Sequence, residues 1–183
     1  MSNGVTDLLP DMAAADVIWV VQLLEHSQID VWVDGGWGID ALLGEQTRPH
    51  EDLDIVVQQM ELPKLRRLFS GQGYKDVERP DSQAWNFVLG DQNGHQVDVH
   101  AVVFDEKRNG IFGPVENGLM YPAGSLLGNG VIGGYPVRCI AAEYVILFHR
   151  NYEPRPKDFL DVTALCQRFG LAYPEEYARI RKP

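Results

Sequence analysis

The segment at residues 34–57, DGGWGIDALLGEQTRPHEDLDIVV, constrains the fold of this chain more than any other stretch. The apolar residues 31–33 before it predict a short strand, which the glycine pair 35–36 interrupts. Residues 37–43 then predict a helical segment that a glycine ends, and residues 52–57 predict a second strand. The chain therefore places two carboxylates one residue apart on a strand, just downstream of a bare glycine pair.

Asp52 and Asp54 share one face of the second strand, because side chains alternate along a strand, while Leu53 and Ile55 take the other face. The two aspartates lie roughly 7 Å apart, at ~3.4 Å per residue. Carboxylates this close repel each other unless a cation lies between them or one is protonated. Mg²⁺ prefers carboxylates together with substrate phosphates, which gives the pair a functional explanation. The alternative is a solvent-facing strand edge that carries aspartates without a ligand.

A further strand, predicted at residues 96–104, adds a third carboxylate. In the sequence GHQVDVHAVV, Asp98 and His100 share one face, whereas the intervening valines take the other. A charge in the middle of such a strand needs compensation. If this strand pairs beside the Asp52 strand, the three carboxylates can hold two metal ions that brace the attacking and leaving oxygens of a phosphoryl-type displacement.

Gly35 and Gly36 lie between a predicted strand and a predicted helix. Glycine allows a ligand to approach the backbone closely, and the N–H groups of a first helical turn bind anions. The pair therefore predicts a binding site for a triphosphate. A glycine pair alone is weak evidence, and the aspartate-bearing strands around it make the prediction specific.

The remaining sequence predicts a β-rich first part and a helical last part. A helix with Asp11 as its N-cap is expected to run to about His26. The other expected helices cover residues 62–69, 141–150, 157–169 and 174–181, and the other expected strands cover residues 74–78, 84–89 and 136–140. Residues 109–135 are rich in Gly, Pro and Asn, which predicts loops with short strands. We expect one domain at residues 1–105, followed at residues 106–183 by a glycine-rich connector and a helical domain.

Composition limits the class of protein. The 183 residues are 45% hydrophobic and 23% charged, which is typical of a globular chain. No apolar run reaches the ~18 residues of a membrane span, and we expect no signal peptide. Cys139 and Cys166 are not in a metal-ligand spacing, so two reduced thiols in a cytoplasmic protein are expected. The formal net charge of -10 disfavours a nucleic acid partner and favours a cationic small molecule, although solubility alone also explains it.

Three stretches resemble small antibiotic nucleotidyltransferases of the DNA polymerase β-like superfamily. The stretch VWVDGGWGIDALLGEQTRPHEDLDIVV looks like the signature of lincosamide nucleotidyltransferases most of all, and aminoglycoside 2''-nucleotidyltransferases carry a similar block. VDVHAV resembles the third-carboxylate strand of the lincosamide enzymes, and VRCIAAEYVILFHRNYEPRPKDFLDVTAL resembles their C-terminal helices. The resemblance implies an α+β fold with a mixed sheet flanked by helices and a small, mostly helical C-terminal part.

The resemblance also implies an activity. It is the Mg²⁺-dependent transfer of a nucleoside monophosphate, AMP from ATP above all, to a hydroxyl of a lincosamide, with release of pyrophosphate. Two Mg²⁺ ions are expected on Asp52, Asp54 and Asp98, and Asp98 is also the expected general base. Residues implied to bind the nucleotide are Gly35, Gly36, Trp37, Arg48 and Lys157. Residues considered for the acceptor are His100, His149 and Tyr152.

Several of these residues also have a purely structural interpretation. Trp37 could be a core anchor, and His50 a turn residue. His100 and His149 could serve only packing or the end of a helix. Asp40 is expected to be solvated or capping. The remaining pair, Asp158 and Asp161, is expected to be helix-surface charge.

Other functions remain open from the sequence. The same chemistry on an aminoglycoside is the first alternative. A toxin-type nucleotidyltransferase that modifies a protein or RNA is the second, and the acidic charge argues against RNA. A non-catalytic nucleotide-binding module is the third, and the presence of all three carboxylates argues against it. The site could close within one chain or at a dimer interface.

Overall fold

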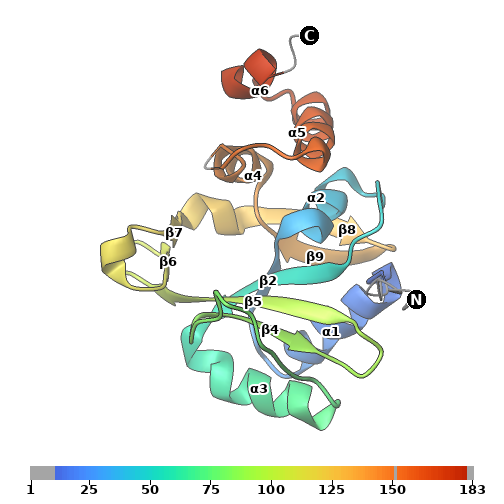
Figure 1. Ribbon diagram of the computed structural model, residues 1–183, viewed down its shortest axis with the longest axis vertical. Coiled ribbons are helices and arrows are strands. Elements are labelled where there is room, and N and C mark those ends of the chain that lie inside the picture. Colours follow the sequence, from blue (N-terminus) through green and yellow to red (C-terminus); the bar gives the residue numbers. More distant parts are fainter. Residues whose placement is uncertain (1–10, 151, 181–183) are drawn as a thin grey trace, which may run out of the picture.

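A mixed β-sheet forms the centre of the molecule in the computed structural model, which describes residues 11–150 and 152–180 (Figure 1). Its order is β3-β4-β5-β2-β1-β9-β8, with β6 pairing with β5 and β7. Strands β2 and β5 are parallel, as are β1 and β9, and the other pairs are antiparallel. The strands are β1 Val31–Val33, β2 Asp52–Gln58, β3 Lys75–Val77, β4 Asn86–Gly90, β5 Gln96–Phe104, β6 Gly110–Phe112, β7 Met120–Tyr121, β8 Gly128–Ile132 and β9 Tyr135–Cys139.

Helices cover both faces of the sheet. Figure 1 shows α1 and α3 on one side, and α2, α4 and α5 on the other, with α6 beyond α5. The α-helices are α1 Ala14–His26, α2 Gly35–Leu43, α3 Leu62–Gly71, α4 Ala142–Phe148, α5 Pro156–Phe169 and α6 Glu175–Ile180. Short 3₁₀ turns lie at η1 Gln59–Glu61, η2 Val115–Asn117 and η3 Ala123–Leu127. The expected mixed sheet flanked by helices is confirmed.

Alternation along β2 and β5 separates the core from the functional face. Leu53, Ile55, Val97 and Val99 are fully buried. The side chains between them project to the opposite face, where α2 and α5 lie. The apolar face anchors both strands, which leaves the carboxylates at fixed positions on the other side.

Several element boundaries differ from the expected ones. Helix α1 has Ala13, not Asp11, as its N-cap, because Asp16 accepts a hydrogen bond from the Ala13 N–H at 3.1 Å. Helix α2 begins at Gly35 rather than Trp37, because Asp34 caps it and accepts from the Gly35 N–H at 2.8 Å. Gly44 ends the helix in the left-handed conformation as predicted, with φ 80.

The sheet crosses the division expected at residue 105. Strand β9 pairs with β1, and β8 pairs with β9, so both extend the sheet that β2 and β5 begin. One hydrophobic cluster includes Leu53 of β2, Val137 of β9 and Leu165 of α5. The α-helices after residue 105, α4, α5 and α6, stand outside the sheet.

Two features expected from composition can be compared with the structure. Cys139 and Cys166 are both buried and unpaired, which fits the prediction of free thiols. Among the helices at residues 11–150 and 152–180, none is long and apolar enough to cross a membrane.

Candidate active site

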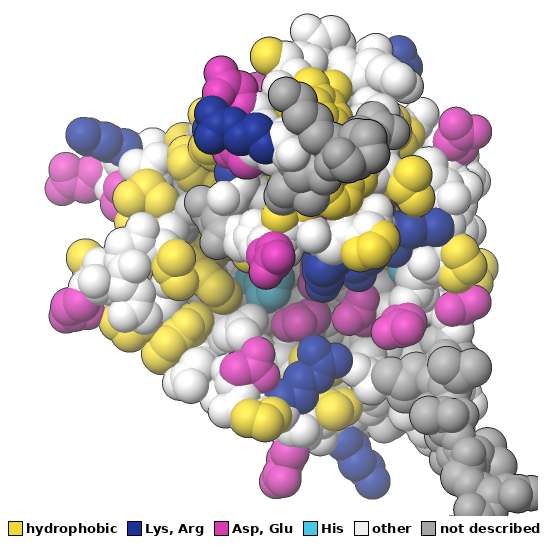
Figure 2. Space-filling view, turned by 45° about the horizontal axis from the view of Figure 1, so that its top comes forward, with side chains coloured by type: hydrophobic (Ala, Val, Ile, Leu, Met, Phe, Trp, Pro, Cys, Tyr) yellow, Lys and Arg dark blue, Asp and Glu magenta, His cyan; other side chains and the backbone are white. Residues whose placement is uncertain are grey.

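The three predicted carboxylates lie on neighbouring strands. Strands β2 and β5 pair in parallel with Asp54 opposite Asp98 and Asp52 opposite Gln96. All three aspartates therefore face the same side of the sheet. Ligand atoms of Asp54, Asp98 and His100 lie within 4.8 Å of one another. Figure 2 shows acidic and histidine side chains gathered in a hollow on this face, with Lys and Arg side chains close by.

The glycine pair lies directly against this cluster. Gly35 has φ 55, and a Cβ added there would lie 1.9 Å from Asp54 Oδ2. A Cβ on Gly36 would lie 2.3 Å from His50 Nδ1 and 2.9 Å from an Arg48 guanidinium nitrogen. At both positions a Cβ would therefore displace a functional side chain, which glycine avoids.

A cavity of about 560 Å³ opens above the carboxylates. One wall comes from α2 and β2 and includes Gly35, Gly36, Asp52 and Asp54. The other comes from the end of α4 and the start of α5 and includes His149, Tyr152, Arg155 and Lys157. Arg48 and Arg79 complete its positive charges. Both walls come from the same chain.

His100 lies behind Asp54 in a chain of polar contacts. Its Nδ1 donates to the Tyr121 hydroxyl at 3.0 Å, and that hydroxyl donates to Asp34 Oδ2 at 2.9 Å. Its Nε2 is 3.6 Å from Asp98 Oδ1. Burial lowers the pKa of His100, but the carboxylates of Asp34, Asp54 and Asp98 outweigh it and raise the pKa to about 9. A protonated imidazole therefore faces the carboxylate cluster.

The two central carboxylates are electrostatically unfavourable without a cation. Burial, together with the charges of Asp52, Asp34 and Asp98, raises the pKa of Asp54 to about 7, although His100 opposes the shift. Burial also raises the pKa of Asp98, against the opposing charges of His100 and Arg79. Asp98 Oδ1 is buried and has no hydrogen-bond partner among the described residues. An orphaned carboxylate oxygen beside a second carboxylate fits a divalent cation with oxygen ligands.

Trp37 does not line the cavity. Its ring is 2% exposed and packs against His50, with ring centroids 4.9 Å apart. Helix α2 begins at Gly35, which turns the indole away from the cavity and into the core. The expectation that Trp37 lines the phosphates is therefore not retained, and its alternative interpretation as a core anchor agrees with this placement.

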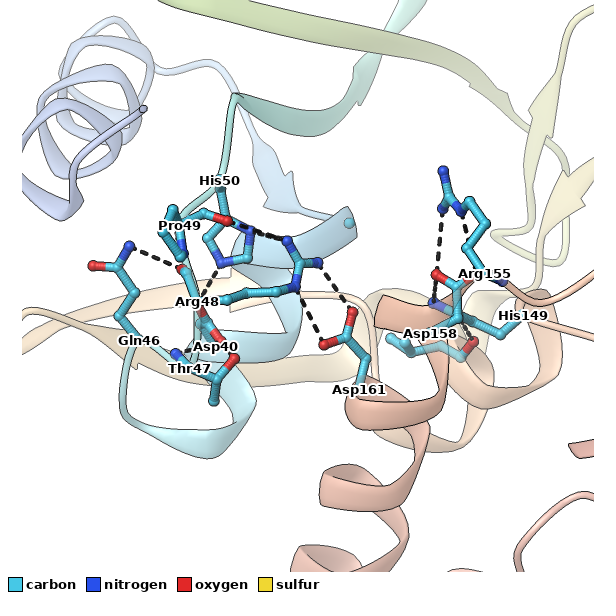
Figure 3. Close-up of polar contacts among 12 residues, drawn as sticks. Asp40, Gln46, Thr47, Arg48, Pro49, His50, His149, Arg155, Asp158 and Asp161 are labelled. Atoms are coloured by element: carbon cyan, nitrogen blue, oxygen red, sulfur yellow. Dashed lines mark hydrogen bonds and ion pairs between the residues drawn. The ribbon is translucent and has the colours of Figure 1, made fainter. Parts of the chain in front are cut away.

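Asp40 and His50 are also buried, contrary to the expectations of a solvated group and a turn residue. Asp40 accepts hydrogen bonds from His50, from the Thr47 N–H and from the Thr47 hydroxyl (Figure 3). A buried carboxylate needs such partners, and all of them come from the loop before β2. His50 in turn contacts Arg48, so the loop is held by side chains rather than by a regular turn.

Asp158 and Asp161 are not helix-surface charges. They are 1% and 4% exposed, because α5 packs against α2 and α4. Asp158 caps α5 through the Arg155 N–H at 2.8 Å and pairs with the Arg155 guanidinium. Asp161 pairs with Arg48 at 3.0 Å. His149 donates from Nδ1 to the Val145 carbonyl at 2.8 Å, and its Nε2 lies 3.8 Å from Asp158.

Arg79 is a site residue that sequence reasoning missed. The Arg79 guanidinium lies 3.8 Å from Asp98 Oδ2 and donates to Gln96 at 2.7 Å. It lies in a stretch without a regular apolar pattern, so no signal in one sequence singles it out. Tyr121 also belongs to the site and comes from β7, in the glycine-rich connector.

A second cavity of about 360 Å³ adjoins the first and shares Gly35, His149 and Tyr152 with it. Its other lining residues are mostly apolar and come from the connector and α4: Phe112, Leu119, Met120, Tyr121, Val145 and Phe148, among others. Leu119 and Met120 are 53% and 45% exposed. The connector thus supplies an apolar wall beside the carboxylates.

Comparison with known proteins matches this architecture to antibiotic-modifying enzymes. A family model described as aminoglycoside-2''-adenylyltransferase matches residues 16–165. A lincosamide resistance protein of Staphylococcus haemolyticus is 26% identical over 151 residues, which cover 82% of this chain and 92% of that protein. A 2''-aminoglycoside nucleotidyltransferase of Escherichia coli is 28% identical over 146 residues, which cover 76% of this chain and 75% of that protein.

Solved structures share the fold. The lincomycin-bound lincosamide antibiotic adenylyltransferase LnuA matches with a TM-score of 0.72 at 23% identity, over 85% of this chain and 98% of its own. ANT(2'')-Ia in complex with adenylyl-2''-tobramycin matches with a TM-score of 0.67 at 22% identity, over 92% of this chain and 94% of its own. The predicted α+β fold of polymerase β-like nucleotidyltransferases is confirmed, as is the predicted resemblance.

Proposed function

Because the chain belongs to the aminoglycoside-2''-adenylyltransferase family and is therefore a nucleotidyltransferase, we propose that it transfers AMP from ATP to a hydroxyl of a lincosamide antibiotic. The observation that carries the proposal is the pairing of Asp54 with Asp98 directly against Gly35, beneath a cavity lined by cations. This arrangement offers carboxylates for metal and positive charge for a triphosphate in one place.

The nucleotide would lie in the larger cavity. The first N–H groups of α2 after Gly35 face it and favour phosphate oxygens. Lys157 and Arg155 on the opposite wall, with Arg79 beside Asp98, add positive charge. Asp52, Asp54 and Asp98 would hold Mg²⁺, which when bound polarises phosphoryl oxygens and offsets their charge.

Asp98 would act as general base. In the proposed reaction its carboxylate takes the proton of the acceptor hydroxyl while that oxygen forms a bond to the α-phosphorus. The bond from the α-phosphorus to the bridging oxygen breaks, and pyrophosphate leaves with the electron pair. Burial raises the pKa of Asp98, which makes this carboxylate a better base than an ordinary aspartate.

The smaller cavity would take the acceptor. Its wall of Phe112, Leu119, Met120 and Phe148 offers contacts to hydrocarbon. Such a wall suits a lincosamide, which combines a sugar with apolar groups, better than a polycationic aminoglycoside. The aminoglycoside remains the second candidate, because the family model that matches the chain is named for that acceptor. Availability of ATP makes the cytoplasm the proposed site of action.

The test combines each of the four nucleoside triphosphates and Mg²⁺ with a panel of lincosamides and aminoglycosides. Pyrophosphate release and product mass are recorded together. We expect lincomycin or clindamycin to gain the mass of AMP. Turnover with aminoglycosides alone would move the substrate and keep the chemistry. Label transfer to a macromolecule in lysate, without antibiotic turnover, would favour a toxin-type enzyme. Nucleotide binding with no transfer to any acceptor would favour a non-catalytic module.

A further inference from the structure

A chain of buried polar contacts joins the two walls of the larger cavity (Figure 3). It runs from Asp40 on α2 through His50 and Arg48, both in the loop before β2, to Asp161 on α5. Arg48 lies 2.9 Å from His50 Nδ1 and 3.0 Å from Asp161 Oδ2. Asp40, His50 and Asp161 are all 4% exposed or less.

The direction of each hydrogen bond follows from Arg48. A guanidinium only donates, so His50 Nδ1 must be the acceptor, and the proton of the neutral ring is on Nε2. That N–H donates to Asp40 Oδ2, while Asp40 Oδ1 accepts from Thr47. Each hydrogen bond in this series of contacts has one possible direction, because reversing it would place two donors or two acceptors opposite each other.

Most N–H groups of Arg48 donate to the protein. Its Nε and one terminal nitrogen donate to Asp161, and the other terminal nitrogen donates to His50 and to the Pro49 carbonyl. Arg48 also lines the cavity, so its expected contact with phosphate stays a prediction beside this structural role. The guanidinium also packs against Gly36, since a Cβ there would lie 2.9 Å from it.

Asp161, the last residue in this series of contacts, lies on the helix that also carries Lys157. Lys157 and Asp161 are four residues apart on α5, which places them on the same face of the helix. Lys157 lines the cavity opposite Gly35 and Gly36. Because both residues belong to one helix, contacts that fix the position of Asp161 relative to the glycine pair also fix the distance between Lys157 and the glycine pair.

We infer that Asp40, His50, Arg48 and Asp161 are positioning residues that hold α5 against the glycine turn, so that Lys157 meets a triphosphate bound there. The inference rests on the proposed function, because it assumes that a nucleoside triphosphate occupies this cavity. None of the four residues needs to touch the nucleotide for its loss to weaken binding.

The test measures the dissociation constant of Mg·ATP by calorimetry, without acceptor, for Asp161→Asn, Asp40→Asn and Lys157→Gln. Removing the negative charge of Asp161 would by itself strengthen the binding of an anionic ligand. Weaker binding in Asp161→Asn therefore indicates that Lys157 is no longer held in position. Asp40 lies outside the cavity, and an asparagine there cannot accept from both Thr47 and His50. We expect each variant to weaken binding about tenfold, the effect of losing one hydrogen bond to a charged group.

A double-mutant cycle separates positioning from general damage. If Asp161 acts through Lys157, Asp161→Asn adds little further loss in the Lys157→Gln background. Asp76→Asn is the matched control, because it removes the same charge from a surface pair with Arg66, and we expect it to leave binding unchanged. Melting temperatures of all variants show that the folded protein is being compared.

Two results would overturn the inference. One is unchanged or tighter binding in Asp161→Asn or Asp40→Asn. The other is a loss in Asp161→Asn that simply multiplies with that of Lys157→Gln. Failure of nucleotide binding, on which the inference rests, is distinguishable from both, because the unmodified protein would then not bind Mg·ATP and Lys157→Gln would change nothing. Failure of transfer to an acceptor appears in the turnover assay and leaves this comparison of binding constants unaffected.

Discussion

Replacing Gly35 by alanine should damage the reaction far more than the fold. At φ 55, a Cβ costs about 1–2 kcal/mol, which corresponds to a melting temperature lower by roughly 2–8 °C. The new methyl group would lie 1.9 Å from Asp54 Oδ2, so that carboxylate must move by more than 1 Å. Displacements of about 1 Å in a catalytic constellation can cost roughly 100-fold in rate.

Gly44→Ala is the matched control. Gly44 also has a positive φ, of 80, but a Cβ added there would meet no atom of the described residues within 4 Å. It should lose a similar amount of thermal stability and keep its kcat/KM. The assay is pyrophosphate release with ATP and lincomycin, beside thermal melts of both variants. If Gly35→Ala loses no more activity than Gly44→Ala, the position of the Asp54 carboxylate does not matter, and the reasoning that places the metal beside the glycine turn is refuted.

Three further predictions concern the carboxylates and the acceptor. Asp98→Asn should lower kcat by ~10²–10⁴-fold in a turnover assay, while calorimetry should show little change in Mg·ATP binding. Equal losses in turnover and binding would make Asp98 mainly a metal ligand. Mg²⁺ at about 100 times its dissociation constant should stabilise the fold by about 2.7 kcal/mol, or roughly 5–10 °C in a thermal melt. Asp54→Asn should abolish that shift and, above pH 7, raise the metal-free melting temperature, because burial and the neighbouring carboxylates raise the pKa of Asp54 to about 7 and so disfavour its ionised form. A retained shift would contradict a metal on Asp54. Leu119→Ser should raise the KM for lincomycin about three- to tenfold, because part of the apolar contact between the leucine and the ligand is lost. Val115→Ser, at an exposed position, is the control. Equal effects of the two substitutions would show that the acceptor does not bind in this cavity.

Much of the local structure could be predicted because it depends on neighbours in the chain. The strands at Val31–Val33 and Gln96–Phe104 lie where the apolar pattern placed them. Helix ends were less accurate, since a cap depends on which side chain reaches the free N–H groups. At α1, Asp16 performs that role from inside the helix rather than Asp11 from outside it.

The candidate site was predictable where alternation along a strand decides it. That Asp52 and Asp54 share one face follows from a period of two residues, whereas Asp98 joins them because β2 and β5 pair in register. The resemblance added Lys157, which lines the same cavity. Arg79 was not predictable, because it comes from a loop whose path depends on packing. Its guanidinium reaches Asp98 only because β4 pairs with β5.

The sequence by itself determined which side chains project together from each strand, and that a glycine pair separates the first strand from the helix after it. Only the tertiary structure decided which charges are buried. Asp40 and Asp161 look like surface residues on their own helices, yet each is buried because a side chain from another segment hydrogen-bonds its carboxylate. A carboxylate leaves water only when such a partner is in place. Arg48 and Asp161 are 113 positions apart in the sequence, so the fold alone brings that pair together.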